Sequence, residues 1–142
     1  MKVKVTPSKV HGNVKIPASK SMAHRALICA SLSDGTSLVS NVTNSKDIEA
    51  TVGCMKALGA IIKQIDETTY EVTGTNLFKQ EGSITCNANE SGSTLRFLIP
   101  LAACTNAKVK FLGQGRLLQR PMDVYANEFK KQNIESDPPA AA

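Results

Sequence analysis

Aromatic residues and long apolar runs are scarce in this chain of 142 residues. Aromatics make up 4% of it and tryptophan is absent, while apolar residues reach 42%, so its core must be mainly aliphatic. No apolar run approaches the roughly 20 residues that cross a membrane, and no signal-peptide pattern opens the chain. We therefore expect a soluble cytoplasmic protein with no membrane partner, built as one compact domain or two tightly packed small units.

Recognisable patterns for metal and nucleic-acid binding are also missing. The two histidines, His11 and His24, stand at no ligand spacing from a cysteine, so we predict no metal site. The cysteines show no CxxC pair and lie in apolar segments, which favours buried thiols in a reducing compartment; they are Cys29, Cys54, Cys86 and Cys104.

The chain carries 17 Lys and Arg against 12 Asp and Glu, a net charge of +5. This excess suits an anionic small molecule, weak contact with nucleic acid, or simply a solvated basic surface. Without an aromatic RNA-binding pair, zinc-finger spacing or a basic run, we expect no nucleic-acid partner.

Hydrophobic periodicity predicts a mixed α/β (α+β) fold. Strands are predicted at 2–6, 14–16, 38–42, 61–65, 70–73, 84–86 and 109–112. Helices are predicted from Ser19 to about residue 34, from Asn44 or Ser45 to 58, at 95–103 with a kink at Pro100, and at 121–132. The tail 136–142 has no periodic pattern and no stop signal, so we expect it to be unstructured.

The two halves of the chain share an order of elements. Arg25 and Arg96, Leu27 and Leu98, and Leu38 and Val109 are each 71 residues apart, and helix, strand and helix follow one another in both halves. This indicates a duplicated α/β unit; a chance alignment of common residues is the alternative.

The stretch PASKSMAHRAL gathers Lys20, Ser21 and Arg25 at the start of a predicted helix. Free backbone amides and the positive end of the helix dipole lie at such a start, and residues i and i+4 share one face. The ammonium of Lys20, the planar guanidinium of Arg25 and the hydroxyl of Ser21 are groups that suit a phosphate or carboxylate. The alternative is a solvated helix start with Arg25 in a surface ion pair. We expect His24 to pack or face solvent rather than act as a base.

A second candidate anion site lies at Gly92 and Ser93, where a glycine-rich turn before a helix lets the backbone approach an oxyanion. The loop GQGRLLQRPMD adds Arg116 and Arg120; Arg120 either turns toward the same anions or caps or pairs with Asp123. Two such sites suggest two anionic substrates, or one with two charged groups. No nucleophile–base pair is recognisable, so positioning and electrostatics would dominate any catalysis.

Three stretches in order, IPASKSMAHRALICASL, ESGSTLRFLIPLAA and GRLLQRPMD, closely resemble the amino-terminal part of the 5-enolpyruvylshikimate-3-phosphate synthase family. The resemblance implies repeated βαβαββ units of the enolpyruvyl transferase fold, here only their N-terminal portion. It implies a 3-phosphoshikimate 1-carboxyvinyltransferase of chorismate and aromatic amino acid biosynthesis. Such an enzyme joins shikimate 3-phosphate to phosphoenolpyruvate through a tetrahedral intermediate and releases phosphate, with no metal or organic cofactor.

The resemblance also implies roles for individual residues. By position, Lys20 contacts both substrates near the reacting atoms and is the catalytic residue. Ser21 and Arg25 match ligands of shikimate 3-phosphate. The residues that match the phosphoenolpyruvate site, with Lys20, are Gly92, Ser93 and Arg120.

The chain departs from the family pattern in two ways. The turn Asn-Ala-Gly-Thr of well-studied bacterial members is replaced by Glu90-Ser91-Gly92-Ser93, so the role of Glu90 and the sensitivity to glyphosate, which occupies the phosphoenolpyruvate site, stay open. Family members are also much longer, and their second half supplies acid/base carboxylates. We expect residues 1–14 to pack with that missing domain and 15–135 to form units of the N-terminal domain. Our prediction is a fragment that binds its substrates weakly but does not turn over alone.

Two alternatives remain at this stage. The first is the sibling enolpyruvyl transferase that acts on a UDP-amino sugar, although Ser19-Lys20-Ser21-x-x-x-Arg25 favours the shikimate enzyme because the sibling has a Lys-Asn start. The second is a non-catalytic fragment that binds anions or another chain.

Overall fold

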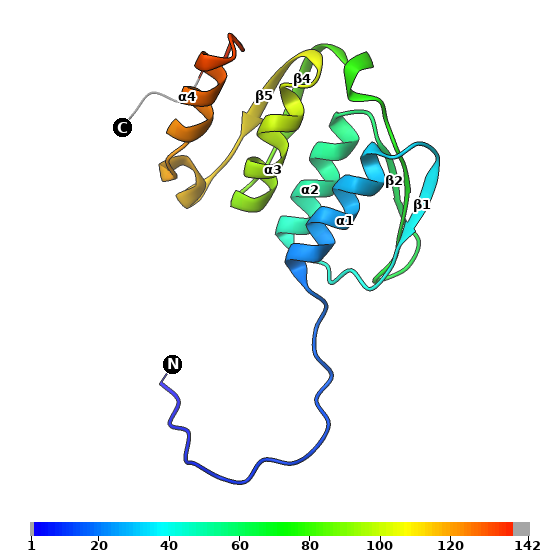
Figure 1. Ribbon diagram of the computed structural model, residues 1–142. Coiled ribbons are helices and arrows are strands. Elements are labelled where there is room, and N and C mark those ends of the chain that lie inside the picture. The colour runs from blue at the N-terminus through cyan, green and yellow to red at the C-terminus, as the bar shows by residue number, and fades with distance from the viewer. Residues whose placement is uncertain (1, 138–142) are drawn as a thin grey trace.

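Regular structure in this computed structural model, which describes residues 2–137, begins at residue 20 (Figure 1). The helices are α1 (Lys20–Leu32), α2 (Lys46–Ala57), α3 (Gly92–Ala102) and α4 (Asp123–Lys131). The strands are β1 (Thr36–Val39), β2 (Ile61–Gln64), β3 (Tyr70–Thr73), β4 (Glu81–Asn87) and β5 (Asn106–Leu112). Two 3-10 turns, Leu77–Lys79 and Gly115–Gln119, precede β4 and α4.

A serine fixes the start of each of the first three helices. The side-chain oxygen of Ser19 accepts a hydrogen bond from the Met22 amide at 3.4 Å, and Ser45 and Ser91 do the same for the amide three residues on, at 3.3 and 3.2 Å. Each cap satisfies one of the backbone donors that an α-helix leaves free at its start. Because Ser91 serves as a cap, α3 begins at Gly92, three residues before the predicted start.

The strands form two small sheets. The order β1-β3-β2 is antiparallel, with β3 in the middle and Glu71 opposite both Leu38 and Lys63. The carboxylate of Asp66 accepts a bond from the Thr68 amide at 2.7 Å in the β2–β3 turn, and this bond lowers the pKa of Asp66. The second sheet is the parallel pair β4-β5, whose strands are joined through α3.

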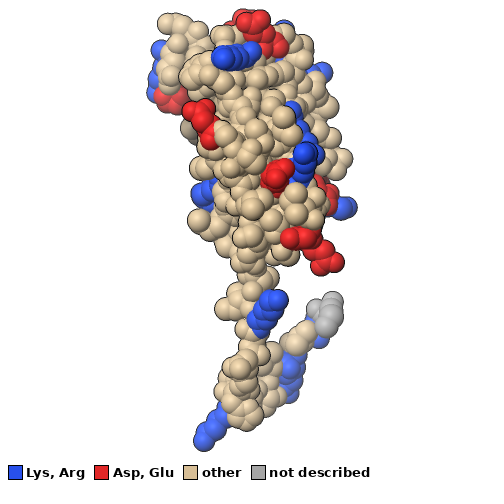
Figure 2. Space-filling view, turned by 90° about the vertical axis from the view of Figure 1, so that its right-hand side faces the viewer, with Lys and Arg blue, Asp and Glu red and all other residues tan. Residues whose placement is uncertain are grey.

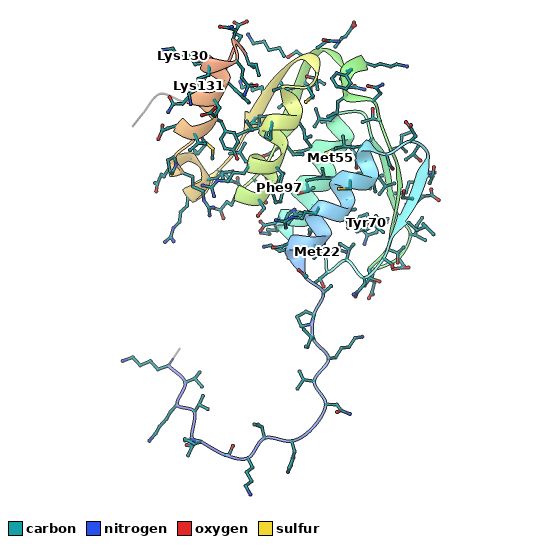
Figure 3. All side chains as sticks on the ribbon, in the orientation of Figure 1. Met22, Met55, Tyr70, Phe97, Lys130 and Lys131 are labelled. Carbon is teal, nitrogen blue, oxygen red and sulfur yellow. The ribbon has the colours of Figure 1, made fainter. Side chains whose placement is uncertain are left out.

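The core is aliphatic, as predicted. Helices α1 and α2 pack against each other and line the three-stranded sheet, where Met55 and Tyr70 are labelled in Figure 3. Branched aliphatics make up half of the largest fully buried side chains, whose apolar members include Leu27, Ile48, Met55, Leu58, Val72 and Leu98. Cys54 and Cys86 are buried, but Cys29 and Cys104 are exposed, so the prediction of four buried thiols is half wrong.

The predicted strands at 2–6 and 14–16 are not formed. Residues 2–17 are exposed and have no regular structure, including valines such as Val5, which is 84% exposed. The alternating pattern is typical of a strand, but a strand needs a neighbour for its backbone hydrogen bonds, and no strand of the described chain pairs with these segments. Packing of residues 1–14 on another domain therefore stays a prediction. The predicted tail lies largely outside the described residues.

The same order of elements occurs in both halves: α1-β1-α2, then α3-β5-α4. Shifting α1 by 71 residues gives 91–103, close to the observed 92–102 of α3, and shifting β1 gives 107–110, inside β5. Helix α3 continues through Pro100 to Ala102, and α4 starts two residues later than predicted. The halves differ in pairing, because β1 pairs antiparallel with β3 whereas β5 pairs parallel with β4.

Candidate functional site

The starts of α1, α2 and α3 meet at one end of the molecule (Figure 1). Lys20, the first residue of α1, forms an ion pair with the carboxylate of Asp47 in the first turn of α2. The backbone carbonyl of Asp47 accepts a hydrogen bond from the Thr94 hydroxyl of α3 at 3.2 Å. The two predicted anion sites, at Lys20 and at Gly92–Ser93, therefore adjoin through Asp47. Because each helix start carries partial positive charge, this end favours anions.

Arg120 lies against the backbone of Gly92. A Cβ atom added at Gly92 would be 2.4 Å from Nη1 of Arg120 and 3.1 Å from Cζ, so the guanidinium occupies the space of a side chain. Among residues 2–137 no ion pair joins Arg120 to Asp123, so that alternative is not realised. Of the two positions left open by the sequence, Arg120 takes the one beside the glycine turn. Its role as an anion ligand is a prediction.

Arg25 is held over α3, and no ion pair within residues 2–137 involves it. Its Cζ atom stands 4.9 Å from the centroid of the Phe97 ring, and its Nη1 donates to the backbone carbonyl of Ser21 at 2.8 Å. Phe97 is labelled on α3 in Figure 3. A guanidinium over a ring face is attracted by the ring quadrupole. The contact therefore fixes a cation of α1 to the helix that carries Ser93.

The hydroxyl groups of Ser21 and Ser93 lie in the first turns of α1 and α3. Both residues are exposed, and neither side chain makes a hydrogen bond within the described part of the chain. Both hydroxyls are therefore accessible to a ligand at the shared end of the helices.

The carboxylate of Glu90 lies against Gly115. A Cβ atom at Gly115, whose φ is +56°, would fall 1.6 Å from Oε1 of Glu90. Glu90 therefore packs against the turn that precedes Arg120, a contact that only a residue without a side chain permits.

Asp47 and Phe97 are site residues that sequence reasoning missed. Asp47 lies in the first turn of a predicted helix, and no local pattern connects it with Lys20, 27 residues away. Phe97 lies in an apolar helical pattern that predicts core packing. Burial of His24 beside this corner lowers its pKa; Asp47 partly opposes the effect, and Lys20 and Arg25 add to it.

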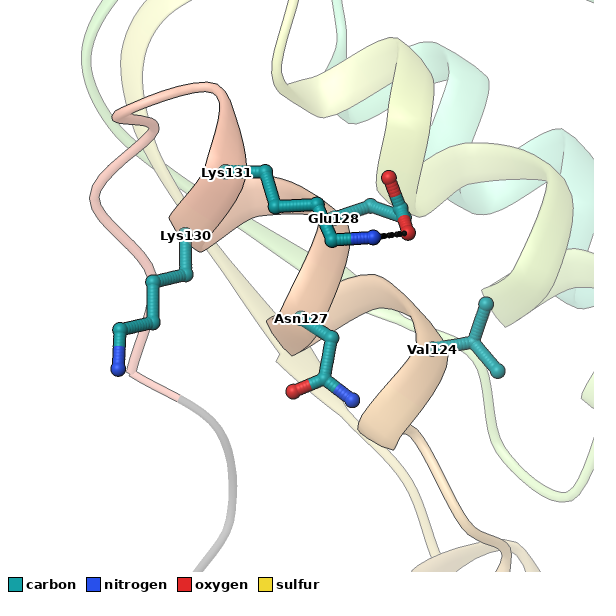
Figure 4. A pocket seen from close by; sticks show the side chains of 5 residues that line it. All are labelled: Val124, Asn127, Glu128, Lys130 and Lys131. Carbon is teal, nitrogen blue, oxygen red and sulfur yellow. Dashed lines mark hydrogen bonds and ion pairs between the residues drawn. The ribbon is translucent and has the colours of Figure 1, made fainter.

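An open depression on α4 does not coincide with these residues (Figure 4). It is lined by Val124, Asn127, Glu128, Lys130 and Lys131, and Nζ of Lys131 lies 2.7 Å from the Glu128 carboxylate. Figure 2 views the side of the three-stranded sheet, where acidic and basic groups are mixed over the folded body. Neither view offers a second concentrated anion site.

The described residues offer neither a metal-binding cluster nor a membrane-spanning helix. Within residues 2–137, no three His, Cys, Asp or Glu side chains cluster as a metal site would require. No helix of that same stretch has the length and apolar character to cross a membrane.

Comparison with known proteins gives consistent matches. The sequence model of the family described as EPSP synthase (3-phosphoshikimate 1-carboxyvinyltransferase) matches residues 4–137. A 3-phosphoshikimate 1-carboxyvinyltransferase of Clostridium perfringens strain SM101 is 50% identical over 134 residues, covering 94% of this chain and 31% of that protein. The protein of that name from Clostridioides difficile strain 630 is 46% identical over 144 residues, covering 94% and 32%. This chain thus spans about a third of the length of these relatives.

Solved structures agree on the fold. Two structures of the EPSP synthase from Acinetobacter baumannii superpose with TM-scores of 0.72 and 0.74 at 20% identity. They cover 87% and 84% of this chain, which in turn covers 28% and 27% of theirs. The α/β fold, as the N-terminal portion of a longer architecture, is therefore confirmed.

Proposed function

This chain belongs to the EPSP synthase family, that of the 3-phosphoshikimate 1-carboxyvinyltransferases, and on that basis we propose that it forms one wall of such an enzyme's substrate site. The substrates are shikimate 3-phosphate and phosphoenolpyruvate, which together carry two phosphates and a carboxylate. The products are 5-enolpyruvylshikimate 3-phosphate and phosphate. This wall supplies cations, hydroxyls and helix-start amides to those anions.

The observation that carries the proposal is the junction of the three helix starts. Asp47 pairs with Lys20 through its carboxylate and accepts a hydrogen bond through its carbonyl from Thr94, the residue that follows the Gly92–Ser93 turn. Arg120 lies on Gly92 of the same turn. The cations that the resemblance assigns to two different substrates thus line one corner. Two anions must lie close together if they are to react with each other, and this corner meets that requirement.

The family resemblance assigns a role to each residue, and the chemistry of each side chain suits that role. The two-pronged guanidinium of Arg25 and the hydroxyl of Ser21 bind the phosphate of shikimate 3-phosphate. Gly92, Ser93 and Arg120 bind phosphoenolpyruvate. Lys20, between the two groups, stabilises negative charge that develops at the reacting centre.

Residues 2–137 place no acid/base pair at this corner, and the chain has about a third of its relatives' length. We propose that the remaining groups come from a carboxy-terminal part and that the 142 residues alone bind without turnover. Within this proposal the chain would work in the cytoplasm.

The test is an NMR titration of the 142-residue chain with shikimate 3-phosphate, followed by phosphoenolpyruvate. Amide shifts should concentrate at the starts of α1 and α3 and near Arg120. Lys20→Ala should weaken both titrations, while Lys63→Ala, which removes the same charge from an exposed pair with Glu71, should leave them unchanged. Absence of shifts at millimolar ligand, or equal effects of the two variants, would contradict the proposal.

Two other candidates are decided by related measurements. Preference for a UDP-amino sugar over shikimate 3-phosphate would favour the sibling transferase, although the similar proteins named above are shikimate enzymes. Adding the carboxy-terminal part of a relative should restore turnover. Its failure to do so, with the anions still bound, would favour a non-catalytic anion-binding chain.

A further inference from the structure

A buried chain of polar side chains runs behind the corner formed by the helix starts. Nδ1 of His24 in α1 lies 2.7 Å from Oγ1 of Thr51 in α2, which lies 2.7 Å from Oγ1 of Thr94 in α3. The Thr94 hydroxyl continues to Oγ of Ser91 at 2.7 Å. All four residues are no more than 1% exposed, so water does not satisfy these groups in place of their partners.

The chain lies one helical turn behind the exposed ion pair. Lys20 and His24 are residues i and i+4 of α1, and Asp47 and Thr51 are residues i and i+4 of α2. The pairs Lys20–Asp47 and His24–Thr51 are therefore successive contacts between the same two helix faces. Thr94 is bonded to both, through the Asp47 carbonyl and the Thr51 hydroxyl.

We infer that His24, acting through Thr51 and Thr94, is a positioning residue that fixes the phosphoenolpyruvate turn relative to Lys20. The inference rests on the function proposed above, because that function makes the separation of the two anion sites matter. Thr94 directly follows Ser93, and Ser91 directly precedes Gly92. The hydrogen-bonded side chains therefore hold the residues on both sides of the turn, while the anion-binding side chains stay on the surface.

The carbonyl acceptor at Asp47 sets the direction of the bonds that run from His24 to Thr94. A backbone carbonyl only accepts, so the contact with Asp47 requires the single hydroxyl proton of Thr94, which points toward that carbonyl and the Ser91 oxygen. Thr51 must then donate to Thr94, and Nδ1–H of His24 must donate to Thr51. In a neutral ring this leaves Nε2 without a proton, as a buried acceptor that has no partner among the described residues.

A neutral ring with its proton on Nδ1 is a specific expectation. The opposite tautomer would bury an N–H donor at Nε2 with no acceptor, which native structures avoid. A charged ring would add that donor and a buried positive charge close to Lys20 and Arg25, with Asp47 as the opposing charge.

The test compares Thr94→Val, which keeps the shape and removes the hydroxyl, with Thr94→Ser, which keeps the hydroxyl. Ser31→Ala is the matched control, because Ser31 is also a fully buried hydroxyl of α1 but bonds only to the Leu27 carbonyl, at 2.7 Å. Long-range ¹H–¹⁵N spectra of the 142-residue chain report the His24 tautomer. Titrations with phosphoenolpyruvate and shikimate 3-phosphate report affinity.

We expect the Nδ1–H tautomer in the native chain and in Ser31→Ala, and a changed ring signal in Thr94→Val. Phosphoenolpyruvate should bind about fivefold more weakly to Thr94→Val, a typical size for coupling between sites, with Thr94→Ser near the native value. Thr51→Val, which breaks the chain one bond farther from the turn, carries the same expectation if Thr94→Val does not fold.

The outcomes separate this inference from the proposed function. If the native chain binds neither substrate, the proposed function is refuted and the positioning role with it, whatever the tautomer. If the native chain binds and Thr94→Val binds equally well, only the positioning role is overturned. An Nε2–H tautomer would likewise overturn the inference and leave the proposed function intact.

Discussion

Replacing Gly92 by alanine should separate the stability of the fold from the binding of phosphoenolpyruvate. The new Cβ would stand 2.4 Å from Nη1 of Arg120 and 3.1 Å from its Cζ. These atoms end a long flexible side chain, so Arg120 should move while the first turn of α3 stays in place. The backbone of Gly92 has no positive φ that would oppose a side chain.

The two effects have opposite signs. Alanine is preferred over glycine in a helix by about 0.5–1 kcal/mol, so the free energy of unfolding should stay level or rise. Displacing Arg120 removes a hydrogen bond to a charged group, which contributes about 1.5–3 kcal/mol. The dissociation constant for phosphoenolpyruvate should therefore rise about 10- to 150-fold.

Urea unfolding and an NMR titration with phosphoenolpyruvate measure the two quantities. Gly53→Ala in α2 is the control, because its Cβ would meet nothing within 4 Å; it should gain stability with unchanged affinity. Arg120→Ala alone should match the loss in Gly92→Ala, and the double variant should lose no more, because both act through one side chain. Additive losses, or a clear loss of stability in Gly92→Ala, would refute this reasoning.

Three further predictions concern the same corner. Asp47→Asn should tighten binding of inorganic phosphate by up to about fivefold and change stability by less than about 1 kcal/mol, because the pair with Lys20 is exposed; weaker binding in a phosphate titration would contradict this. Phe97→Leu should weaken shikimate 3-phosphate about two- to fivefold by removing the ring under Arg25, and an unchanged dissociation constant would argue against that contact. Because burial lowers the pKa of His24 in the folded state, its contribution to stability is full above its unfolded pKa of about 6.5 and is lost as the pH falls toward the folded pKa. His24→Gln should therefore flatten the acid side of the stability curve measured by urea unfolding, and an identical slope would exclude this titration as its cause.

Local signals in the sequence determine the helices. Serine caps and apolar spacing predict α1 and α2 within a few residues, because both signals act within one or two turns. The strands at 61–65 and 70–73 were predicted for the same reason, and in the fold they pair as β2 and β3 across a turn closed by its own residues. The start of β5 was missed. The predicted strand covers 109–112, whereas β5 begins at Asn106, and its first residues include the exposed Lys108.

Contacts between distant segments could not be predicted in the same way. The pairing of Lys20 with Asp47 and the position of Arg25 over Phe97 depend on how α1 packs against its neighbours. Periodicity also predicted strands before α1, but it reports only what a segment prefers. Whether a neighbouring strand is available to pair with that segment depends on the whole fold, so the local pattern cannot show it.

Strand β1 forms the edge of its sheet, since its only sheet neighbour is β3. Within residues 2–137 no strand pairs with its outer side, and Leu38 on it is 70% exposed. The alternating segment 2–6 of the same chain is equally unpaired and extends away from the folded body (Figure 1). An open edge and a loose segment with strand character can join between two molecules, as in domain swapping and edge-to-edge aggregation. Protein concentration is therefore a variable in every experiment on this chain, and binding constants should be compared at concentrations where it is monomeric.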